Sequence, residues 1–375
     1  MDFSFTEEQS MLRDMVGSYL ADRYGFEARQ AAMDSAEGWR PEVWQALATE
    51  LGVLGASLPE DAGGLGGGPV ENMVLMEALG SAIFIEPYLE TVVLAGALLK
   101  HSGWDGAGEW LQRIAAGEAV LAFAQAEPQS RYDLHDVSTA ARKSGDGWTI
   151  DGRKAVVHAA PWASHLLVTA RTAGERRDRK GVSVFLVDKA APGVTTRDYP
   201  TVDGRRASEI QFENAAATLV AEDALDVVER AVDEAICAAC AEAVGVMRRL
   251  HADTLDYARQ RRQFGRPIAD FQVLQHRMVD MFMAVEQAVS MTYYATLMLD
   301  APAAERARAV SAAKVQTGKA LRHVGQEAVQ IHGGIGMTNE LALGWYFKRA
   351  TVLESLYGDV DHHLERFQRM EAKAA

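Results

Sequence analysis

Two short segments of the 375-residue chain combine residue types that are suited to binding phosphate. One is an arginine-rich stretch with an aromatic residue, and the other contains paired glycines. A planar guanidinium can donate two parallel hydrogen bonds to a phosphate, and a glycine backbone can approach phosphate oxygens closely. Taken singly, the arginine could be solvated and the glycines could end a helix. The residues concerned are Arg261 in the first segment and Gly333 and Gly334 in the second.

The composition describes an ordinary soluble protein with an acidic surface. Hydrophobic residues make up 48% of the chain, charged residues make up 24%, and the net charge is −14. That charge would repel the phosphates of nucleic acid, so we expect no nucleic-acid partner. No apolar run reaches the ~20 residues needed to span a bilayer, and the acidic start Met1-Asp-Phe is unlike a signal peptide. We therefore expect a cytoplasmic protein without a membrane partner.

The two cysteines, Cys237 and Cys240, form the pattern Cys-Ala-Ala-Cys in an alanine-rich stretch. A redox pair would accompany a βαβ pattern, and a zinc site needs about four ligands. The sequence offers neither, and the consecutive His362 and His363 point in different directions on a helix. We expect two buried helix residues and no metal site.

The hydrophobic period changes twice along the chain. Helical spacing begins after Thr6-Glu-Glu-Gln, a capping box. Short alternating runs such as 182–187 then predict strands, with Gly145-Asp-Gly as a hairpin turn. Helical spacing returns near residue 226 and holds almost to the end, which gives an α+β fold. The predicted regions are an N-terminal all-helical domain at 1–117, a middle antiparallel β-domain at 118–225 and a C-terminal helical bundle at 226–375.

Five motifs, in order, resemble those of the acyl-CoA dehydrogenase family over the full length of the chain. Ala126-Glu-Pro resembles the family's Thr-Glu-Pro strand end, and Trp148–Lys154 resembles its strand–turn–Gly-x-Lys hairpin. Tyr257–Ile268, which contains Arg-x-x-Phe-Gly, is similar to its most distinctive signature, and Phe271–His276 follows at the expected distance. Gln330–Met337 resembles its Gln-x-x-Gly-Gly-x-Gly element. The resemblance implies the fold of that family.

The resemblance also implies an activity. The family oxidises an acyl-CoA thioester between Cα and Cβ with FAD, and electrons usually pass to an electron-transferring flavoprotein. Residues that match Arg261, Phe264 and Gln272 reach the FAD of a neighbouring subunit, so the site needs at least a dimer. Gln330, Gly333 and Gly334 belong to the same composite site. Two residues match positions beside the flavin ring, namely Ala126 and, in place of a threonine that touches flavin N5, His158.

The family's catalytic glutamate is absent from both of its usual positions. The loop Leu356-Tyr-Gly-Asp places Tyr357 where many members carry it, and a tyrosine is a poor base at neutral pH. Asp359 in that loop matches a threonine of the family. The second position, on the first helix of the C-terminal region, falls on Ala235.

Two glutamates near Ala235 are the remaining candidates for the base. Glu234 is rotated by about 100° around the helix and could pair with Arg230. Glu242 lies two turns further on nearly the same face, in an apolar stretch that would raise its pKa as in many catalytic bases. The alternative for Glu242 is an ion pair with Arg248 or Arg249. We carry Glu242 and Glu234 forward as candidate catalytic residues.

In these departures and in the segments Pro87–Leu94 and Asp361–Leu364, the sequence most resembles small subunits of heteromeric bacterial acyl-CoA dehydrogenases such as pimeloyl-CoA dehydrogenase. In such pairs a partner chain can supply the base. Arg131-Tyr-Asp also replaces the family's Gly-Ser-Asp, which weakens a standard CoA contact there. The implied partners are acyl-CoA and either a second copy or, in a heterotetramer, a larger subunit. The alternatives are a non-catalytic subunit that completes a partner's FAD site, and a flavin oxidase or monooxygenase on the same scaffold.

Overall fold

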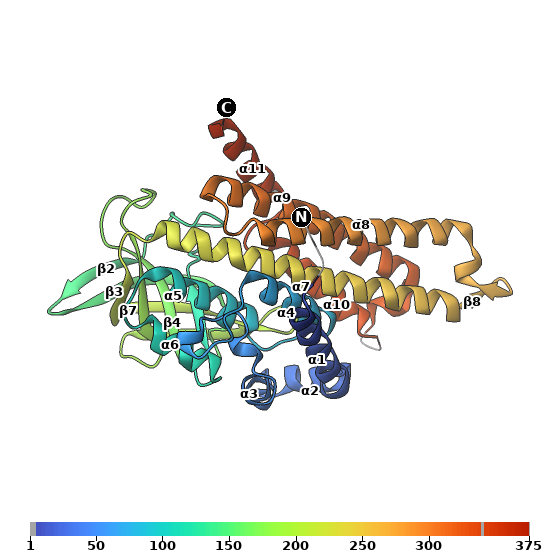
Figure 1. Cartoon of the computed structure of the whole chain (residues 1–375), viewed down its shortest axis with the longest axis horizontal. Helices are drawn as coiled ribbons and strands as arrows, with labels where there is room; N and C mark the ends of the chain where they lie inside the picture. The colour runs from blue at the N-terminus through green and yellow to red at the C-terminus, as the bar shows by residue number, and fades with distance from the viewer. Residues whose placement is uncertain (1–4, 339–340, 375) are drawn as a thin grey trace. The chain divides into compact units, whose positions relative to one another are not determined.

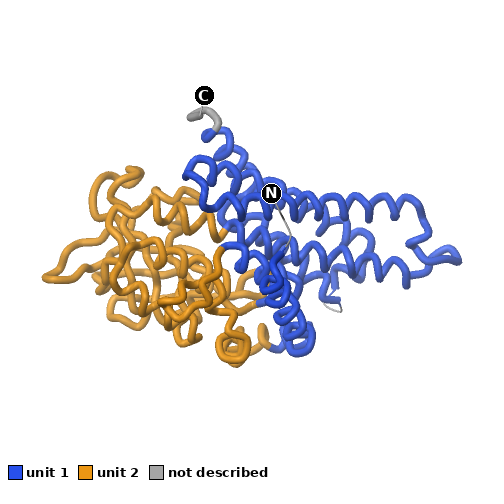
Figure 2. The backbone as a smooth tube through the Cα atoms, in the orientation of Figure 1, with its two compact units in different colours: residues 1–31, 69–84, 236–375 blue, residues 32–68, 85–235 orange. Residues whose placement is uncertain are grey.

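The structure, a computed structural model, describes residues 5–338 and 341–374. Contacts divide the chain into two compact units, each assembled from separate stretches, which Figure 2 colours blue and orange. The first unit comprises residues 1–31, 69–84 and 236–375, and the second comprises residues 32–68 and 85–235.

The predicted α+β fold is confirmed, because helices come first along the chain, strands follow and helices return (Figure 1). The region boundaries after residues 117 and 225 stay a prediction. Each compact unit takes residues from before position 117, and the long helix α7 (Leu225–Gln260) contributes to both units.

The first unit is helical. Its α1 begins with the predicted capping box, in which Thr6 Oγ1 accepts from Gln9 N at 3.2 Å and Gln9 Oε1 accepts from Thr6 N at 3.0 Å. Helix α9 packs against α8, α10 and α11. Besides the later part of α7, its helices are α1 (Glu7–Arg23), the start of α2 (Phe26–Asp34), α4 (Pro69–Ser81), α8 (Gln272–Leu297), α9 (Ala303–His332), the short η5 (Gly333–Met337), α10 (Leu343–Ser355) and α11 (Val360–Ala374).

Helices α4 and α7 approach each other closely because two glycines lie where they cross. A Cβ on Gly80 would lie 2.1 Å from the carbonyl oxygen of Glu242, and one on Gly245 would lie 2.0 Å from that of Glu77. Neither position has room for a side chain. The glycines thus set the spacing of the helix that carries Glu242.

The second unit packs short helices with a seven-stranded sheet. The pairings run β4-β2-β3-β7-β5 and back to β4, so they close a ring, with β1 added on β4 and β6 on β7. Pairing is antiparallel except where β4 meets β1 and β2. Ser144 lies opposite Gly147, which confirms the predicted hairpin turn. The strands are β1 (Leu121–Ala124), β2 (Ala140–Ser144), β3 (Gly147–His158), β4 (His165–Arg171), β5 (Val182–Asp188), β6 (Val194–Pro200) and β7 (Arg206–Ala221).

The helical segments of the second unit precede its strands, apart from the start of α7. They are α3 (Pro41–Thr49), the short η1 (Val53–Gly55) and η2 (Glu60–Ala62), the π-helix η3 (Tyr88–Ala95), α5 (Gly96–Ser102) and α6 (Ala107–Ala115).

Candidate functional site

Residues 261–271, which connect the end of α7 to the start of α8, contain a small hairpin with a two-residue turn and the short helix η4 (Ile268–Asp270). Strands β8 (Arg262–Gln263) and β9 (Arg266–Pro267) pair across Phe264 and Gly265, whose φ angles are 52° and 81°. Two positive φ angles in a two-residue loop are typical of a type I′ turn, where a bulky aromatic residue is strained. The Phe264 side chain is nevertheless 91% exposed. A strained, exposed aromatic residue is a candidate for contact with a ligand or another chain.

Arg261 stands at the entrance to this turn. It is exposed, and its guanidinium makes no hydrogen bond or ion pair within residues 5–338 and 341–374. The nearby Arg259, in contrast, pairs with Asp256 at 3.3 Å. Gln272, the first residue of α8, is exposed as well. The turn therefore presents an unengaged guanidinium that can bind a phosphate.

The glycine segment lies at the same end of the first unit. The rings of Tyr257 and His332 stack with centroids 4.2 Å apart, and the Tyr257 hydroxyl donates to the His332 carbonyl at 3.3 Å. This contact brings the end of α9, with Gln330, next to the end of α7. A Cβ on Gly333 or Gly334 would meet no atom within 4 Å. The backbone there is open to a ligand. The six residues that the C-terminal motifs predict to bind FAD thus lie at one end of the helices, and their role stays a prediction.

Ala126 and His158 lie together in the second unit. Ala126 follows β1, and its carbonyl accepts a hydrogen bond from Ala155 N at 2.8 Å. His158 is the last residue of β3, where it is half-buried opposite Ala207 of β7. Ala126 thus lies beside β3 at Ala155, three residues before His158.

A buried ion pair fixes the backbone at this end of the sheet. Lys154 Nζ donates to Glu127 Oε1 at 2.8 Å and to Thr169 Oγ1 at 3.0 Å. Glu127 also accepts from the backbone nitrogens of Ser138 at 2.8 Å and Thr139 at 3.0 Å. Burial raises the pKa of Glu127, but Lys154 and the hydrogen bonds outweigh it and lower the pKa to about 2. Glu127 is therefore an ionised structural carboxylate that joins the Ala126 strand end to residues 138–139.

Glu242 is buried in α7 and held by one arginine. Arg349 of α10 donates Nε to Oε1 at 2.7 Å and Nη2 to Oε2 at 2.8 Å, and the two side chains are 3% and 1% exposed respectively. The suggested pairing with Arg248 or Arg249 is wrong, because those arginines bind other carboxylates. A bidentate guanidinium engages both carboxylate oxygens, which is typical of a structural ion pair. A catalytic role for Glu242 stays a prediction that this geometry does not favour.

Glu234 is also buried, and its neighbours are a histidine and two cationic side chains. His101 Nε2 lies 2.7 Å and Arg230 Nε 3.0 Å from Oε1, while Lys100 Nζ lies 3.5 Å from Oε2. The predicted pairing with Arg230 is confirmed, although the Glu234 side chain is only 5% exposed. Burial raises the pKa of Glu234, but the hydrogen bond from His101 and the charge of Lys100 lower it to about 2. Such a carboxylate is a weak base, so a catalytic role also stays a prediction.

The loop after α10 has no carboxylate at the position expected for a base. Tyr357 has a φ angle of 58°, and its carbonyl accepts from His363 Nε2 at 3.1 Å. Asp359 Oδ1 accepts from the His362 backbone nitrogen at 2.9 Å and so caps α11. Ala235, at the alternative position, is fully buried. In this loop the carboxylate of Asp359 therefore caps the start of α11.

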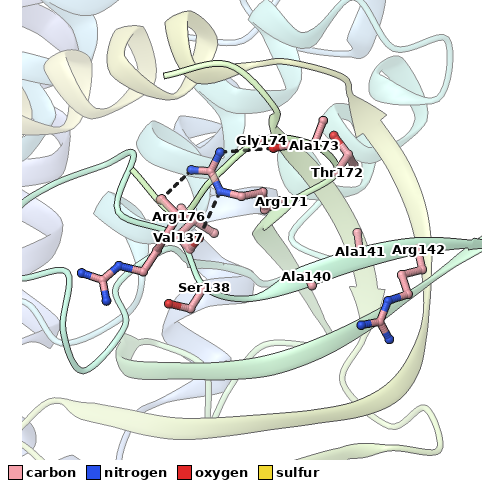
Figure 3. Close-up of a pocket in the computed structure, with 10 residues that line it drawn as sticks. All are labelled: Val137, Ser138, Ala140, Ala141, Arg142, Arg171, Thr172, Ala173, Gly174 and Arg176. Carbon is pink, nitrogen blue, oxygen red and sulfur yellow. Dashed lines mark hydrogen bonds between the residues drawn. The ribbon is translucent and has the colours of Figure 1, made fainter. Parts of the chain in front are cut away.

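A pocket of about 490 Å³ opens beside the start of β2 and the end of β4 (Figure 3). Arg171 ties its two bordering loops together by donating to the carbonyls of Arg176 at 2.8 Å, Lys180 at 2.9 Å and Val137 at 3.2 Å. Arg142 and Arg176 line the pocket with exposed side chains. Arg142 pairs with Asp151 at 3.7 Å and Arg176 with Asp136 at 2.8 Å, so carboxylates already offset both charges. Sequence reasoning missed the pocket, because Arg171 ends a strand whose partners lie far along the chain.

Both cysteines are buried in α7, as predicted. Cys237 and Cys240 form no disulfide, and burial raises the pKa of the Cys240 thiol. Within residues 5–338 and 341–374, no group of three or more His, Cys, Asp or Glu residues is placed to hold a metal ion. That part of the chain also has no helix with the length and hydropathy to cross a membrane.

The sequence matches three acyl-CoA dehydrogenase domains in succession. The N-terminal domain matches residues 6–118, the middle domain residues 122–215 and the C-terminal domain residues 216–370. The chain belongs to the acyl-CoA dehydrogenase family. It is accordingly a flavoprotein oxidoreductase that acts on acyl-CoA, with FAD as its cofactor.

Similar proteins match this acyl-CoA dehydrogenase along nearly their whole length. Acyl-CoA dehydrogenase FadE12 of Mycobacterium tuberculosis is 31% identical over 355 residues, which cover 90% of each chain. Acyl-CoA dehydrogenase IpdE2 of Mycolicibacterium smegmatis is 29% identical over 364 residues, 97% of this chain and 98% of the relative. The ChsE4-ChsE5 complex from Mycobacterium tuberculosis has a chain with TM-score 0.90 and 27% identity, covering 100% of this chain and 99% of that one.

The residues at the exposed end of the first unit fit FAD. Its pyrophosphate needs cationic donors and a backbone without obstructing side chains, and Arg261 with Gly333 and Gly334 offers both. Sequence reasoning found these residues because they lie in continuous motifs. It missed Arg349 and His101 as partners of the two candidate bases, because both lie more than a hundred positions from their carboxylates.

Proposed function

We propose that this acyl-CoA dehydrogenase oxidises its thioester as one subunit of an oligomer in which a neighbouring chain completes each FAD site. The observation that carries the proposal is the exposed end of α7 and α8. The Arg261 guanidinium has no partner among the described residues, and Phe264 beside it is 91% exposed. An exposed guanidinium can bind a phosphate, and an exposed aromatic ring can pack on another molecule. Together they indicate a binding surface.

In this proposal each chain serves two cofactors. Arg261 and the open backbone at Gly333 and Gly334 bind the pyrophosphate of an FAD whose ring lies against Ala126 and His158 of the neighbouring chain. His158 donates a hydrogen bond to that ring, and the buried pair of Lys154 and Glu127 holds the strand end in place. FAD, when bound, supplies the two-electron acceptor, and an electron-transferring flavoprotein reoxidises it.

The apolar face of α8 supports a contact between chains. Val279, Phe282 and Met283 are 55%, 51% and 49% exposed, and their spacing places them on one side of the helix. Val273 and Leu297, near the two ends of α8, are also exposed. Apolar side chains in a row on a soluble protein typically mark an interface. We propose that α8 packs on a second chain and thereby presents Arg261 to its cofactor.

We further propose that the partner is a larger, related chain that supplies the catalytic base. Both oxygens of Glu242 are bound by Arg349, and contacts with His101, Lys100 and Arg230 lower the pKa of Glu234 to about 2. Tyr357 is a poor proton acceptor at neutral pH. The similar ChsE4-ChsE5 structure is a complex of two differently named proteins, which supports a heteromeric assembly.

Anaerobic mixing with a panel of acyl-CoAs, followed by flavin absorbance, tests this proposal. We expect the FAD-loaded chain alone to bleach slowly and the addition of a glutamate-bearing partner to speed bleaching by ~10²–10⁴-fold, the usual contribution of a positioned base. Rapid bleaching by the chain alone would contradict a partner-supplied base. Glu242→Gln and Glu234→Gln would then show which carboxylate acts.

Two other outcomes would identify the alternative functions. The chain is a structural subunit if, in the complex with its partner, no acyl-CoA reduces the FAD bound to this chain although the partner's FAD site is occupied. If a substrate without CoA is oxidised with direct consumption of oxygen, it is a flavin oxidase or monooxygenase on this scaffold.

A further inference from the structure

Glu90 is a buried carboxylate of which one oxygen has no hydrogen-bond partner among the described residues. It lies in the π-helix η3, and its side chain is 7% exposed. Oε1 is 3.4 Å from Arg205 Nη1, whereas Oε2 is buried and makes no hydrogen bond within residues 5–338 and 341–374. π-helices are rare and frequently occur at functional sites, and a buried polar group without a partner requires an explanation.

The other buried carboxylates of the chain show that Glu90 is an exception. Both oxygens of Glu242 accept from Arg349, and both oxygens of Glu127 accept from several donors. Glu234 has cations near each of its oxygens. Across the described ranges, Oε2 of Glu90 is the only fully buried carboxylate oxygen without a donor. A donor on a bound molecule would complete the hydrogen bonding of this oxygen.

Glu90 is tethered to the end of the sheet that carries His158. Its neighbour Thr91 donates Oγ1 to the carbonyl of Leu121, the first residue of β1, at 2.9 Å. Arg205 immediately precedes β7, and the next carbonyl, that of Arg206, accepts from Ala159 N at 3.1 Å. Since His158 adjoins Ala159, the Glu90 carboxylate lies on the same side of the sheet ring as the residue assigned to the flavin.

We propose that Glu90 is a specificity-determining residue whose Oε2 accepts a hydrogen bond from a hydroxyl group on the acyl chain, while Arg205 holds Oε1. A purely aliphatic chain at this place would leave the buried charge without its second donor, whereas a hydroxyl would supply one. The inference rests on the proposed function, because it takes an acyl-CoA as the ligand. The same donor chemistry could come from the ribityl hydroxyls of FAD, and the experiment distinguishes the two sources.

The test uses straight-chain acyl-CoAs of increasing length and their ω-hydroxy counterparts. Equilibrium binding to the FAD-loaded assembly is measured by calorimetry for the wild type, for Glu90→Gln and for Glu222→Gln, an exposed control in the same unit. At the chain length that reaches Glu90, we expect the hydroxy compound to bind about 10- to 100-fold more tightly than its plain counterpart. Glu90→Gln should bring that ratio towards one, and Glu222→Gln should preserve it.

Three results would overturn the inference. The first is a wild-type ratio of one or less at every length, which needs no variant to fold. The second is a loss of FAD from Glu90→Gln with the ratio unchanged, which would assign the donor to the cofactor. The third is a Glu90→Gln variant with the ratio of affinities and the FAD content both unchanged. An ordered water would then be the donor to Oε2. If plain acyl-CoAs bind and reduce the flavin in these cases, the proposed function survives; if no acyl-CoA binds at all, both fail.

Discussion

Buried glutamates in this chain differ in their donors, and the donors indicate what each can do. Glu242 has a bidentate arginine, and Glu234 has a histidine, an arginine and a lysine. Cations at this distance keep a carboxylate ionised and make it reluctant to take up a proton. The same contacts that weaken these residues as bases make them contributors to stability, and that contribution must depend on pH.

Glu234→Gln should lower stability at neutral pH and make it less sensitive to acid. The pKa of Glu234 is lowered from 4.5 to about 2, so its stabilising effect is fully present above pH 4.5 and is lost as pH falls towards 2. The effect amounts to about 3 kcal/mol at most. Urea unfolding at several pH values should show the wild type and the variant converging as pH falls through this window.

The control for this prediction is Glu229→Gln on the same helix. Glu229 pairs with the exposed Arg179, an arrangement that contributes about 0–1 kcal/mol. Its difference from the wild type should be small at every pH. Equal pH dependence in the wild type and Glu234→Gln would contradict the ion-pair assignment.

Continuous motifs allowed candidate cofactor residues to be named from the sequence. Arg261, Phe264 and the glycines at 333 and 334 lie at one end of the helices, and their contact with FAD stays a prediction. The partners of Glu242 and Glu234 could not be predicted, because ion pairing between helices depends on tertiary packing that one sequence does not display. The apolar run around Glu242 indicated burial correctly, but it gave no sign of Arg349.

At the scale of elements, the crossing of α4 and α7 positions Glu242 and the rest of α7 up to Gln260. Gly80 and Gly245 each face a backbone carbonyl of the other helix at a distance that excludes a Cβ. Backbone cannot move aside as a flexible side chain can, so an added methyl group must separate the helices.

Gly245→Ala should therefore destabilise the protein by about 1–3 kcal/mol, the usual effect of overpacking, although alanine favours helix. Gly17→Ala in α1 is the matched control, because a Cβ there meets no atom within 4 Å. We expect it to leave stability unchanged or to raise it by up to ~1 kcal/mol. Urea unfolding that finds the two variants equally stable would contradict the close crossing.

Helices, strands and turns could be predicted where residues close together in the sequence determine them. The Thr6 capping box and the Gly145-Asp-Gly hairpin were correct because their hydrogen bonds join near neighbours. Strand β6 was missed because Val194–Pro200 is mostly exposed and polar, without apolar alternation. The π-helix η3 was missed because its residues are all buried, and a continuous apolar run does not distinguish one helix type from another.

At the scale of the molecule, the chain exposes groups suited to binding a second chain. Arg261 and Phe264 face solvent at one end of the helices, and α8 carries an exposed apolar cluster at Val279, Phe282 and Met283. A second chain would cover both features at once. The central claim is therefore that FAD binding requires association between chains, because the cofactor phosphates need Arg261 from a neighbour.

Size-exclusion chromatography with light scattering and flavin absorbance tests that claim most directly. For the wild type we predict that FAD elutes only with a dimer or a larger assembly. Arg261→Ala should keep the mass of the assembly but bind FAD at least about tenfold more weakly, since a charge-assisted phosphate contact contributes ~1.5–3 kcal/mol. Arg259→Ala, whose arginine already pairs with Asp256, should retain FAD. A stable monomer loaded with FAD, or full retention of FAD by Arg261→Ala, would contradict the account.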